Sequence, residues 1–196
     1  MKKAFLLVVI LLVSVVSTAC INNLAVQELN NKAKTYLDKG DYENAISRLK
    51  SSVDLDSTIF ETHYNLGIAY TQAEKYPEAI ETFTNAIKLR PEFADSYYSL
   101  AVAQENYAKG IIDGSLKKSA NAKDNGVEQK EPEITDNKKT ELTAQEKEQI
   151  LKLFNDSIAS YENYLKKGTN IEDKKDIEDK IEYLKTQCLE YSAKSK

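Results

Sequence analysis

The feature that most constrains the fold of this chain is an internal repeat with a period of 34 residues. When residues 75–91 and their surroundings are compared with the chain 34 residues earlier, residues of similar size and hydrophobicity coincide. The coinciding pairs are Ala33 and Gly67, Tyr36 and Tyr70, Tyr42 and Tyr76, Ala45 and Ala79, Ile46 and Ile80, Leu49 and Phe83, Val53 and Ile87, and Leu55 and Leu89. Such a period predicts stacked copies of one small structural unit.

Within each copy the apolar residues recur with helical spacing and alternate in size. Ala79, Phe83 and Ala86 share one face of a predicted helix in the order small, large, small. Small residues let a second backbone approach closely, so a neighbouring helix is expected against the alanines. Gly40 separates the two predicted helices of the first copy, and Thr58 with Glu61 predicts a capping box at the start of the next helix.

These residues resemble the tetratricopeptide repeat (TPR) family, in which each unit is a helix–turn–helix. The second unit has the family pattern almost complete, whereas the first has Lys32 where leucine is usual. The pattern residues of the second unit are Leu66, Gly67, Tyr70, Tyr76, Ala79, Phe83, Ala86 and Pro91. The resemblance implies an all-α TPR-type solenoid whose first helices line a concave groove.

A third unit begins in the same way but is interrupted. Tyr98, Leu100 and Ala101 match the start of the second unit, yet no second helix follows directly. Residues 109–142 are polar and mixed in charge, which predicts a disordered insertion. The third repeat is therefore expected to be split.

Helical signals resume at Thr143, where Glu146 completes a second predicted capping box. One apolar stripe follows, and Ser157, Tyr161 and Tyr164 occupy the places of the size-alternating residues in the family pattern. The stripe consists of Ile150, Leu153, Phe154, Ile158, Tyr161 and Leu165. Residues 171–191 are expected to form an amphipathic helix that caps the open end of the solenoid.

The N-terminal residues predict export. Lys2 and Lys3 precede an apolar run over residues 4–13, and small residues follow up to Ala19. This order is typical of a signal peptide, and the run is shorter than the roughly 20 residues of a transmembrane helix. We expect a leader over residues 1–19.

The four residues that end in Cys20 resemble a bacterial lipobox, which implies lipidation of Cys20. Cleavage after Ala19 by an ordinary signal peptidase, leaving a free Cys20 thiol, is the alternative. Ile21 is not the aspartate that retains lipoproteins at the inner membrane of enteric bacteria, so the resemblance favours the outer membrane. The chain is expected in the cell envelope, held to the membrane through its N-terminal lipid.

The expected organisation follows. It is a signal peptide over 1–19, a lipidated tether over 20–24, TPR units one and two with the first helix of unit three over 25–108, the insertion over 109–142, and the second helix of unit three with the capping helix over 143–196.

Charge and side-chain chemistry exclude several function classes. Loss of the leader would remove two of the 27 basic residues and none of the 31 acidic ones, leaving a formal charge of −6 that repels nucleic acid. His63 is the only histidine, and no Gly-rich phosphate loop or Cys/His metal spacing occurs. Cys188 lies on an apolar helix face. We expect no catalytic residues, no metal and no cofactor.

The TPR resemblance also implies which side chains face the groove, so that an extended or helical peptide could bind there. They are Asn30, Asn31 and Lys34 in unit one, Tyr64, Asn65 and Ile68 in unit two, and Tyr98, Ser99 and Val102 in unit three. TPR domains that grip chaperone C-termini use a clamp of lysine, arginine and asparagine, of which only Asn65 is matched here; Asp95 and Ser99 stand where basic residues are wanted. The alternative is that the groove residues serve inter-helix packing.

The sequence thus favours a non-catalytic, lipid-anchored TPR scaffold that binds a protein or peptide partner, similar to bacterial TPR lipoproteins that act as envelope adaptors. A second hypothesis is a secreted or lipidated accessory factor that binds peptidoglycan or carbohydrate on its tyrosines. A third, a hydrolase acting through paired carboxylates, has the least support.

Overall fold

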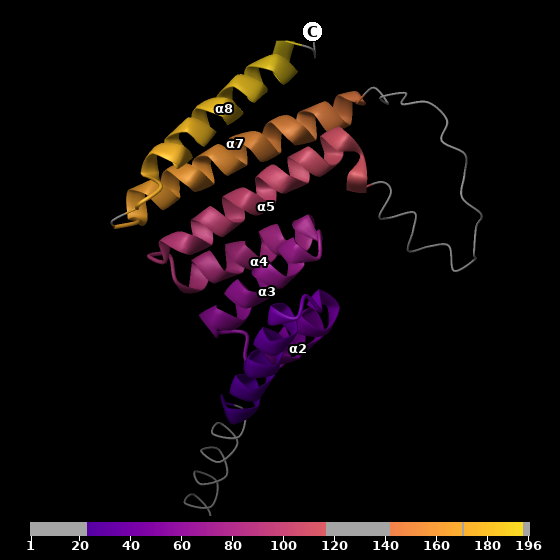
Figure 1. Cartoon of the computed structure of the whole chain (residues 1–196), viewed down its shortest axis with the longest axis vertical. Coiled ribbons are helices and arrows are strands. Elements are labelled where there is room, and N and C mark those ends of the chain that lie inside the picture. The colour runs from indigo at the N-terminus through magenta and orange to yellow at the C-terminus, as the bar shows by residue number, and fades with distance from the viewer. Residues whose placement is uncertain (1–22, 117–141, 170, 194–196) are drawn as a thin grey trace, which may run out of the picture. The chain divides into compact units, whose positions relative to one another are not determined.

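The computed structural model describes residues 23–116, 142–169 and 171–193, and all regular secondary structure in those residues is α-helical (Figure 1). The expected all-α class is therefore confirmed. The signal peptide, Cys20 and residues 117–141 of the expected insertion lie outside the described residues. The chain divides into two compact units, one up to Glu92 and the other from Phe93.

In residues 23–92, the described part of the first unit, four helices form two helix–turn–helix pairs. Residues 23–38 form the first helix, followed by α2 (Tyr42–Leu55), α3 (Phe60–Gln72) and α4 (Tyr76–Leu89). α3 packs against both α2 and α4. The core shared by the first three helices consists of Ala33, Ala45, Ile46, Leu49, Leu66 and Ala69. Most of these are residues that the 34-residue repeat singles out.

The expected close approach of helices occurs where α3 meets α4. Ala79, Phe83 and Ala86 are all buried, at 0%, 1% and 0% exposure. A Cβ atom added at Gly67 would lie 2.6 Å from Cε1 of Phe83, which is closer than two carbon atoms can approach. The absence of a side chain at Gly67 therefore makes room for the Phe83 ring.

The predicted turn at Gly40 is present, but the predicted capping box at Thr58 is wrong. Gly40 has a left-handed φ of 71°. Helix α3 begins only at Phe60, with Ile59 as its N-cap residue and no side-chain cap. Asp56 instead accepts hydrogen bonds from the backbone N–H and the hydroxyl of Thr58, at 2.8 and 2.6 Å. This side-chain turn competes with the capping box for the Thr58 hydroxyl.

The second unit contains α5 (Ala94–Asp113), α7 (Ala144–Lys167) and α8 (Lys174–Ala193). α7 packs against both α5 and α8. The Ser157 hydroxyl on α7 donates to the carbonyl of Ala101 on α5 at 2.9 Å, so these two small residues mark a close helix contact. Pairing of α5 with α7 is what a split third repeat requires. The domain boundaries themselves stay a prediction.

Both ends of the expected insertion can be compared with the structure. The capping box of Thr143 and Glu146 is confirmed at the start of α7. At the other end, α5 continues to Asp113, five residues past the expected boundary at 108. Lys109 pairs with Glu105 one turn earlier, and Gly110 is buried and closely approached by the Leu116 side chain. These local contacts extend the helix beyond the apolar pattern.

Candidate functional site

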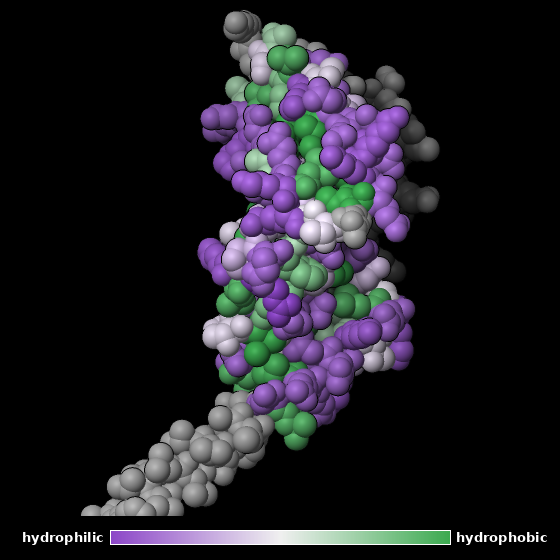
Figure 2. All heavy atoms as spheres, turned by 90° about the vertical axis from the view of Figure 1, so that its left-hand side faces the viewer, coloured by the Kyte–Doolittle hydropathy of each residue, from purple (hydrophilic) through white to green (hydrophobic). Residues whose placement is uncertain are grey.

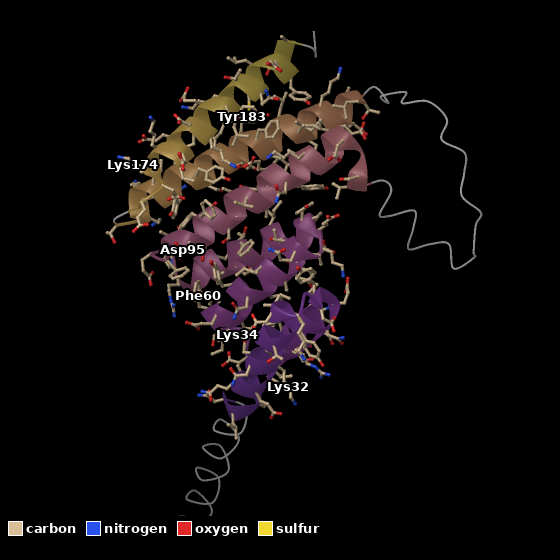
Figure 3. All side chains as sticks on the ribbon, in the orientation of Figure 1. Lys32, Lys34, Phe60, Asp95, Lys174 and Tyr183 are labelled. Carbon is tan, nitrogen blue, oxygen red and sulfur yellow. The ribbon has the colours of Figure 1, made fainter. Side chains whose placement is uncertain are left out.

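Of the groove residues expected in the helix of residues 23–38, one packs between helices and two are exposed to solvent. The Asn30 amide nitrogen lies 2.8 Å from the Ser52 hydroxyl and 2.9 Å from the Thr62 hydroxyl, so this side chain joins the helix of residues 23–38 to α2 and α3. Asn31 and Lys34 are exposed, and Figure 3 shows Lys34 on the helix of residues 23–38. Asn30 therefore has a packing role that the sequence pattern did not reveal.

The two tyrosines expected in the groove both lie in aromatic clusters. Tyr64 stacks on Phe60, with ring centroids 5.8 Å apart, and meets Phe83 edge-on at 6.0 Å. In the second unit, Tyr98 lies 5.8 Å from Tyr161 and 5.2 Å from Tyr164. The contacts with Phe83, Tyr161 and Tyr164 join different helices, which agrees with the alternative of inter-helix packing. The remaining expected residues are half-buried: Asn65 and Ile68 in the first unit, and Ser99 and Val102 in the second.

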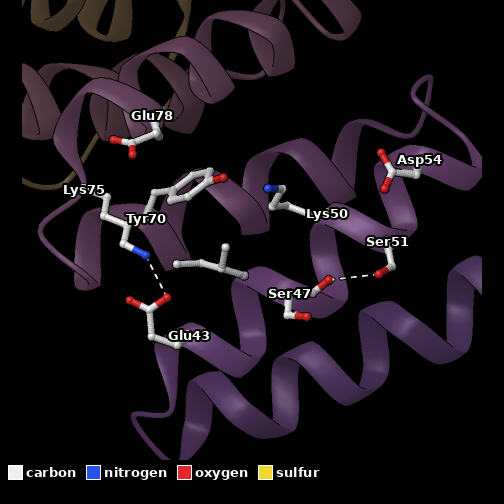
Figure 4. A pocket seen from close by; sticks show the side chains of 9 residues that line it. Glu43, Ser47, Lys50, Ser51, Asp54, Tyr70, Lys75 and Glu78 are labelled. Carbon is white, nitrogen blue, oxygen red and sulfur yellow. Dashed lines mark hydrogen bonds and ion pairs between the residues drawn. The ribbon is translucent and has the colours of Figure 1, made fainter. Parts of the chain in front are cut away.

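A groove that the sequence analysis did not anticipate runs between α2 and α4 in the first unit. Because α3 packs against both helices, α2 and α4 form the walls and α3 forms the floor. One part of the groove has a volume of about 510 Å³, and an adjoining part has about 220 Å³. Figure 4 shows the larger part, in which Lys50 from α2 and the Tyr70 hydroxyl from α3 point toward one another.

The walls of this groove are two polar stripes. The α2 stripe consists of Glu43, Ser47, Lys50 and Asp54, and the α4 stripe of Glu78, Glu81, Thr82 and Asn85. Successive members of the α2 stripe are four, three and four residues apart, and Glu81, Thr82 and Asn85 lie three, four and seven residues beyond Glu78, so each stripe shares one helix face. Such spacing could have indicated a common polar surface from the sequence, but nothing local shows that the two stripes face one another.

Carboxylates dominate the groove. Its lining has four of them, Glu43, Asp54, Glu78 and Glu81, against the ammonium groups of Lys50 and Lys75, a net formal charge of −2. Lys75 is paired with Glu43 at 2.7 Å. Burial raises the pKa of Tyr70, and the nearby charges of Glu78, Glu81 and Glu43 raise it further. The phenol therefore stays neutral, in a negative electrostatic environment.

His63 and Cys188 are the histidine and the cysteine among the described residues. No group of three or more His, Cys, Asp or Glu side chains among them could hold a metal ion. The His63 ring nitrogen Nε2 lies 2.9 Å from the carbonyl oxygen of Ser57, which gives this histidine a structural contact. Cys188 is half-buried, and burial raises the pKa of its thiol, which disfavours the reactive thiolate.

Hydrophilic and hydrophobic side chains are interspersed on the molecular surface shown in Figure 2. None of the described helices combines the length and apolar character required to cross a bilayer.

Comparison with known families identifies the repeat. A tetratricopeptide repeat family model matches residues 60–93, and a second TPR model matches residues 33–73. Residues 33–93 of this chain are tetratricopeptide repeats. The chain also resembles part of serine/threonine-protein phosphatase 5 from Homo sapiens and Rattus norvegicus, with 31% identity over 91 residues. The match covers 46% of this chain and only 18% of the phosphatase.

The solved structure of a TPR domain extends the TPR likeness beyond residues 33–93. The first TPR domain of Spaghetti (RPAP3), bound to the HSP90 peptide SRMEEVD, covers 84% of this chain with 93% of its own length, at a TM-score of 0.54 and 15% identity. The TPR2B domain of yeast Sti1 has a TM-score of 0.47 and 17% identity. The likeness to the RPAP3 domain confirms the TPR-type fold class expected from the sequence.

Proposed function

We propose that this chain is a non-catalytic scaffold in the bacterial cell envelope, anchored by a lipid on Cys20, and that its TPR region binds a protein or peptide partner. The observation that carries the proposal is the open groove between α2 and α4, built on repeats at residues 33–93. Repeat frameworks of this kind present extended surfaces on rigid helices, which suits peptide recognition better than chemistry.

The TPR neighbours support a protein-binding role without identifying the ligand. The RPAP3 domain was solved with an acidic HSP90 peptide, SRMEEVD. In this chain Asp95 and Ser99 occupy the places where a carboxylate clamp has basic residues. We therefore expect a partner whose binding does not depend on a pair of C-terminal carboxylates.

The anchoring part of the proposal rests on the lipobox-like residues that end in Cys20. A lipid there would hold the TPR units near a bilayer, with the outer membrane favoured by Ile21. The peptidoglycan-binding alternative has less support, because its stacking platforms, Tyr64 and Tyr98, have rings packed against other aromatic side chains.

The anchoring is tested by intact mass and membrane fractionation of wild type and Cys20→Ala, expressed in the native cell. We expect acyl chains on the wild-type protein, and loss of both the added mass and the membrane association in the variant. An unmodified, soluble wild-type chain would contradict the lipid anchor while leaving partner binding open.

Partner binding is tested by in-cell photo-crosslinking from positions on the TPR surface, followed by binding measurements with the purified partner. A reproducible crosslinked protein that binds the purified chain directly is expected. Hydrolysis of a cell-envelope substrate by the purified chain would contradict the non-catalytic part of the proposal.

A further inference from the structure

The groove between α2 and α4 has features that select the charge of its ligand. Asp54 on α2 and Glu78 and Glu81 on α4 make no hydrogen bond or ion pair with any residue in the described ranges. None of these three carboxylates has a cationic partner, so their negative charges repel one another. A bound cation would relieve that repulsion. Lys75 pairs with Glu43, whereas Lys50, the other cation in the lining, makes no ion pair with a carboxylate among the described residues.

The floor of the groove suits the apolar part of a long side chain. The half-buried Tyr70 lies between the walls, and the adjoining part of the groove adds Val53 and Leu66. Lysine and arginine have long aliphatic stems that pack on such surfaces while their charged ends remain near water or carboxylates. A tyrosine ring also attracts a cation over its face.

We propose that the α2–α4 groove binds an extended basic segment of the partner protein, with a lysine or arginine stem along Tyr70 and its charged end at Asp54, Glu78 and Glu81. This inference rests on the proposed function, because it assigns the partner's chemistry and the surface that contacts it. It places the contact on the second helices of the repeats, whereas the TPR resemblance places peptide binding on the first helices.

The charge preference is tested by fluorescence anisotropy of the full chain with three labelled octapeptides of the same length. One alternates alanine with lysine and arginine, one has glutamate in place of every basic residue, and one has acetyl-lysine and citrulline, which keep the shape without the charge. We expect the basic peptide to bind at least about tenfold more tightly than the other two.

Three variants locate the binding. Glu78→Lys combined with Glu81→Lys should weaken the basic peptide at least about tenfold and favour the acidic one. The matched control, Glu148→Lys with Glu162→Lys on exposed positions of α7, makes the same charge change outside the groove and should leave binding within about twofold. Lys50→Gln should strengthen the basic peptide about threefold, and a gain of binding cannot result from misfolding.

Photo-crosslinking from two positions separates this inference from the proposed function. One crosslinking residue replaces Ser47 in the groove, and the other, in a second variant, replaces Asn65 on α3. Capture of the same partner from Ser47, with the expected peptide preference, supports both. Capture from Asn65 alone, or equal weakening by the groove and α7 variants, overturns the groove assignment and leaves the scaffold function standing. No partner from either position overturns both.

Discussion

Gly40 and Glu74 have the same left-handed backbone conformation, with φ of 71° and 57°, although they lie 34 residues apart. Each lies in the turn within a TPR unit. The next residue closes the turn in the same way: the N–H of Asp41 donates to Tyr36 O at 2.9 Å, and that of Lys75 to Tyr70 O at 2.8 Å. The repeat therefore requires a left-handed residue at this place, which glycine adopts without strain and glutamate does not.

Glu74→Gly is expected to stabilise the protein by about 0.5–1 kcal/mol, since relief of the left-handed strain exceeds the entropy that glycine adds to the unfolded chain. Urea unfolding followed by circular dichroism measures the change. Gly40→Ala is the matched control and should destabilise by about 1 kcal/mol. Equal effects of alanine and glycine at residue 74 would contradict the strain.

Gly67→Ala is expected to destabilise the protein by about 1–3 kcal/mol, because the new methyl group would overlap the buried Phe83 ring. The free energy of unfolding in urea measures the loss. Phe83→Leu in the Gly67→Ala background should cost less than Phe83→Leu in wild type, since the smaller side chain makes room for the methyl group. Additive effects of the two substitutions would show that the overlap is absorbed elsewhere.

Glu105 gives the second unit a pH-dependent stability. This carboxylate is 3% exposed and accepts a hydrogen bond from the Tyr161 hydroxyl at 2.9 Å, with Lys109 and Lys180 as charge partners. Burial raises its pKa, but the hydrogen bond and charge of Lys109, the charge of Lys180 and the hydrogen bond from Tyr161 outweigh burial, so the pKa lies below its ordinary value of 4.5.

A lowered carboxyl pKa in the folded state adds stability that is present above the unfolded pKa and is lost as the pH falls through the folded one. Glu105→Gln should therefore destabilise the protein by about 1–3 kcal/mol at pH 7, with a difference from wild type that narrows below about pH 4.5. Thermal unfolding between pH 3 and pH 8 tests this. The exposed Glu148→Gln serves as the control, and a difference that stays constant with pH would contradict the assignment.

Arg90 joins the two ends of the second repeat. Its guanidinium lies 4.1 Å from the centroid of the Phe60 ring and bonds to Glu61 at 2.8 Å. Arg90→Ala should cost about 1 kcal/mol, and Arg90→Lys about half as much, because lysine keeps the charge but not the planar contact. Glu61→Gln removes the ion pair and keeps the ring contact. At high salt, only the contribution of the ion pair to the free energy of unfolding should fall. Identical stability of Arg90→Lys and wild type would remove the role of the planar contact.

The sequence by itself determined the helices and their pairing. Several features could be predicted from the sequence because they depend on side-chain size or on residues close in the chain. They are the 34-residue period, the burial of Ala79 and Phe83, the turn at Gly40 and the capping box at Thr143. The tertiary structure decided which helix faces pack against one another and which remain available to bind a partner.

Asn30 illustrates the first part of that decision. In the sequence it is a polar residue on a predicted groove face, yet its amide joins Ser52 and Thr62, residues 22 and 32 positions away. The α2–α4 groove illustrates the second. From the sequence, Asp54 and Glu78 are expected to be ordinary solvent-facing charges. Only the packing of α3 between their helices places them on opposite walls of one groove. Helix periodicity assigns each residue a face, whereas packing determines what that face meets.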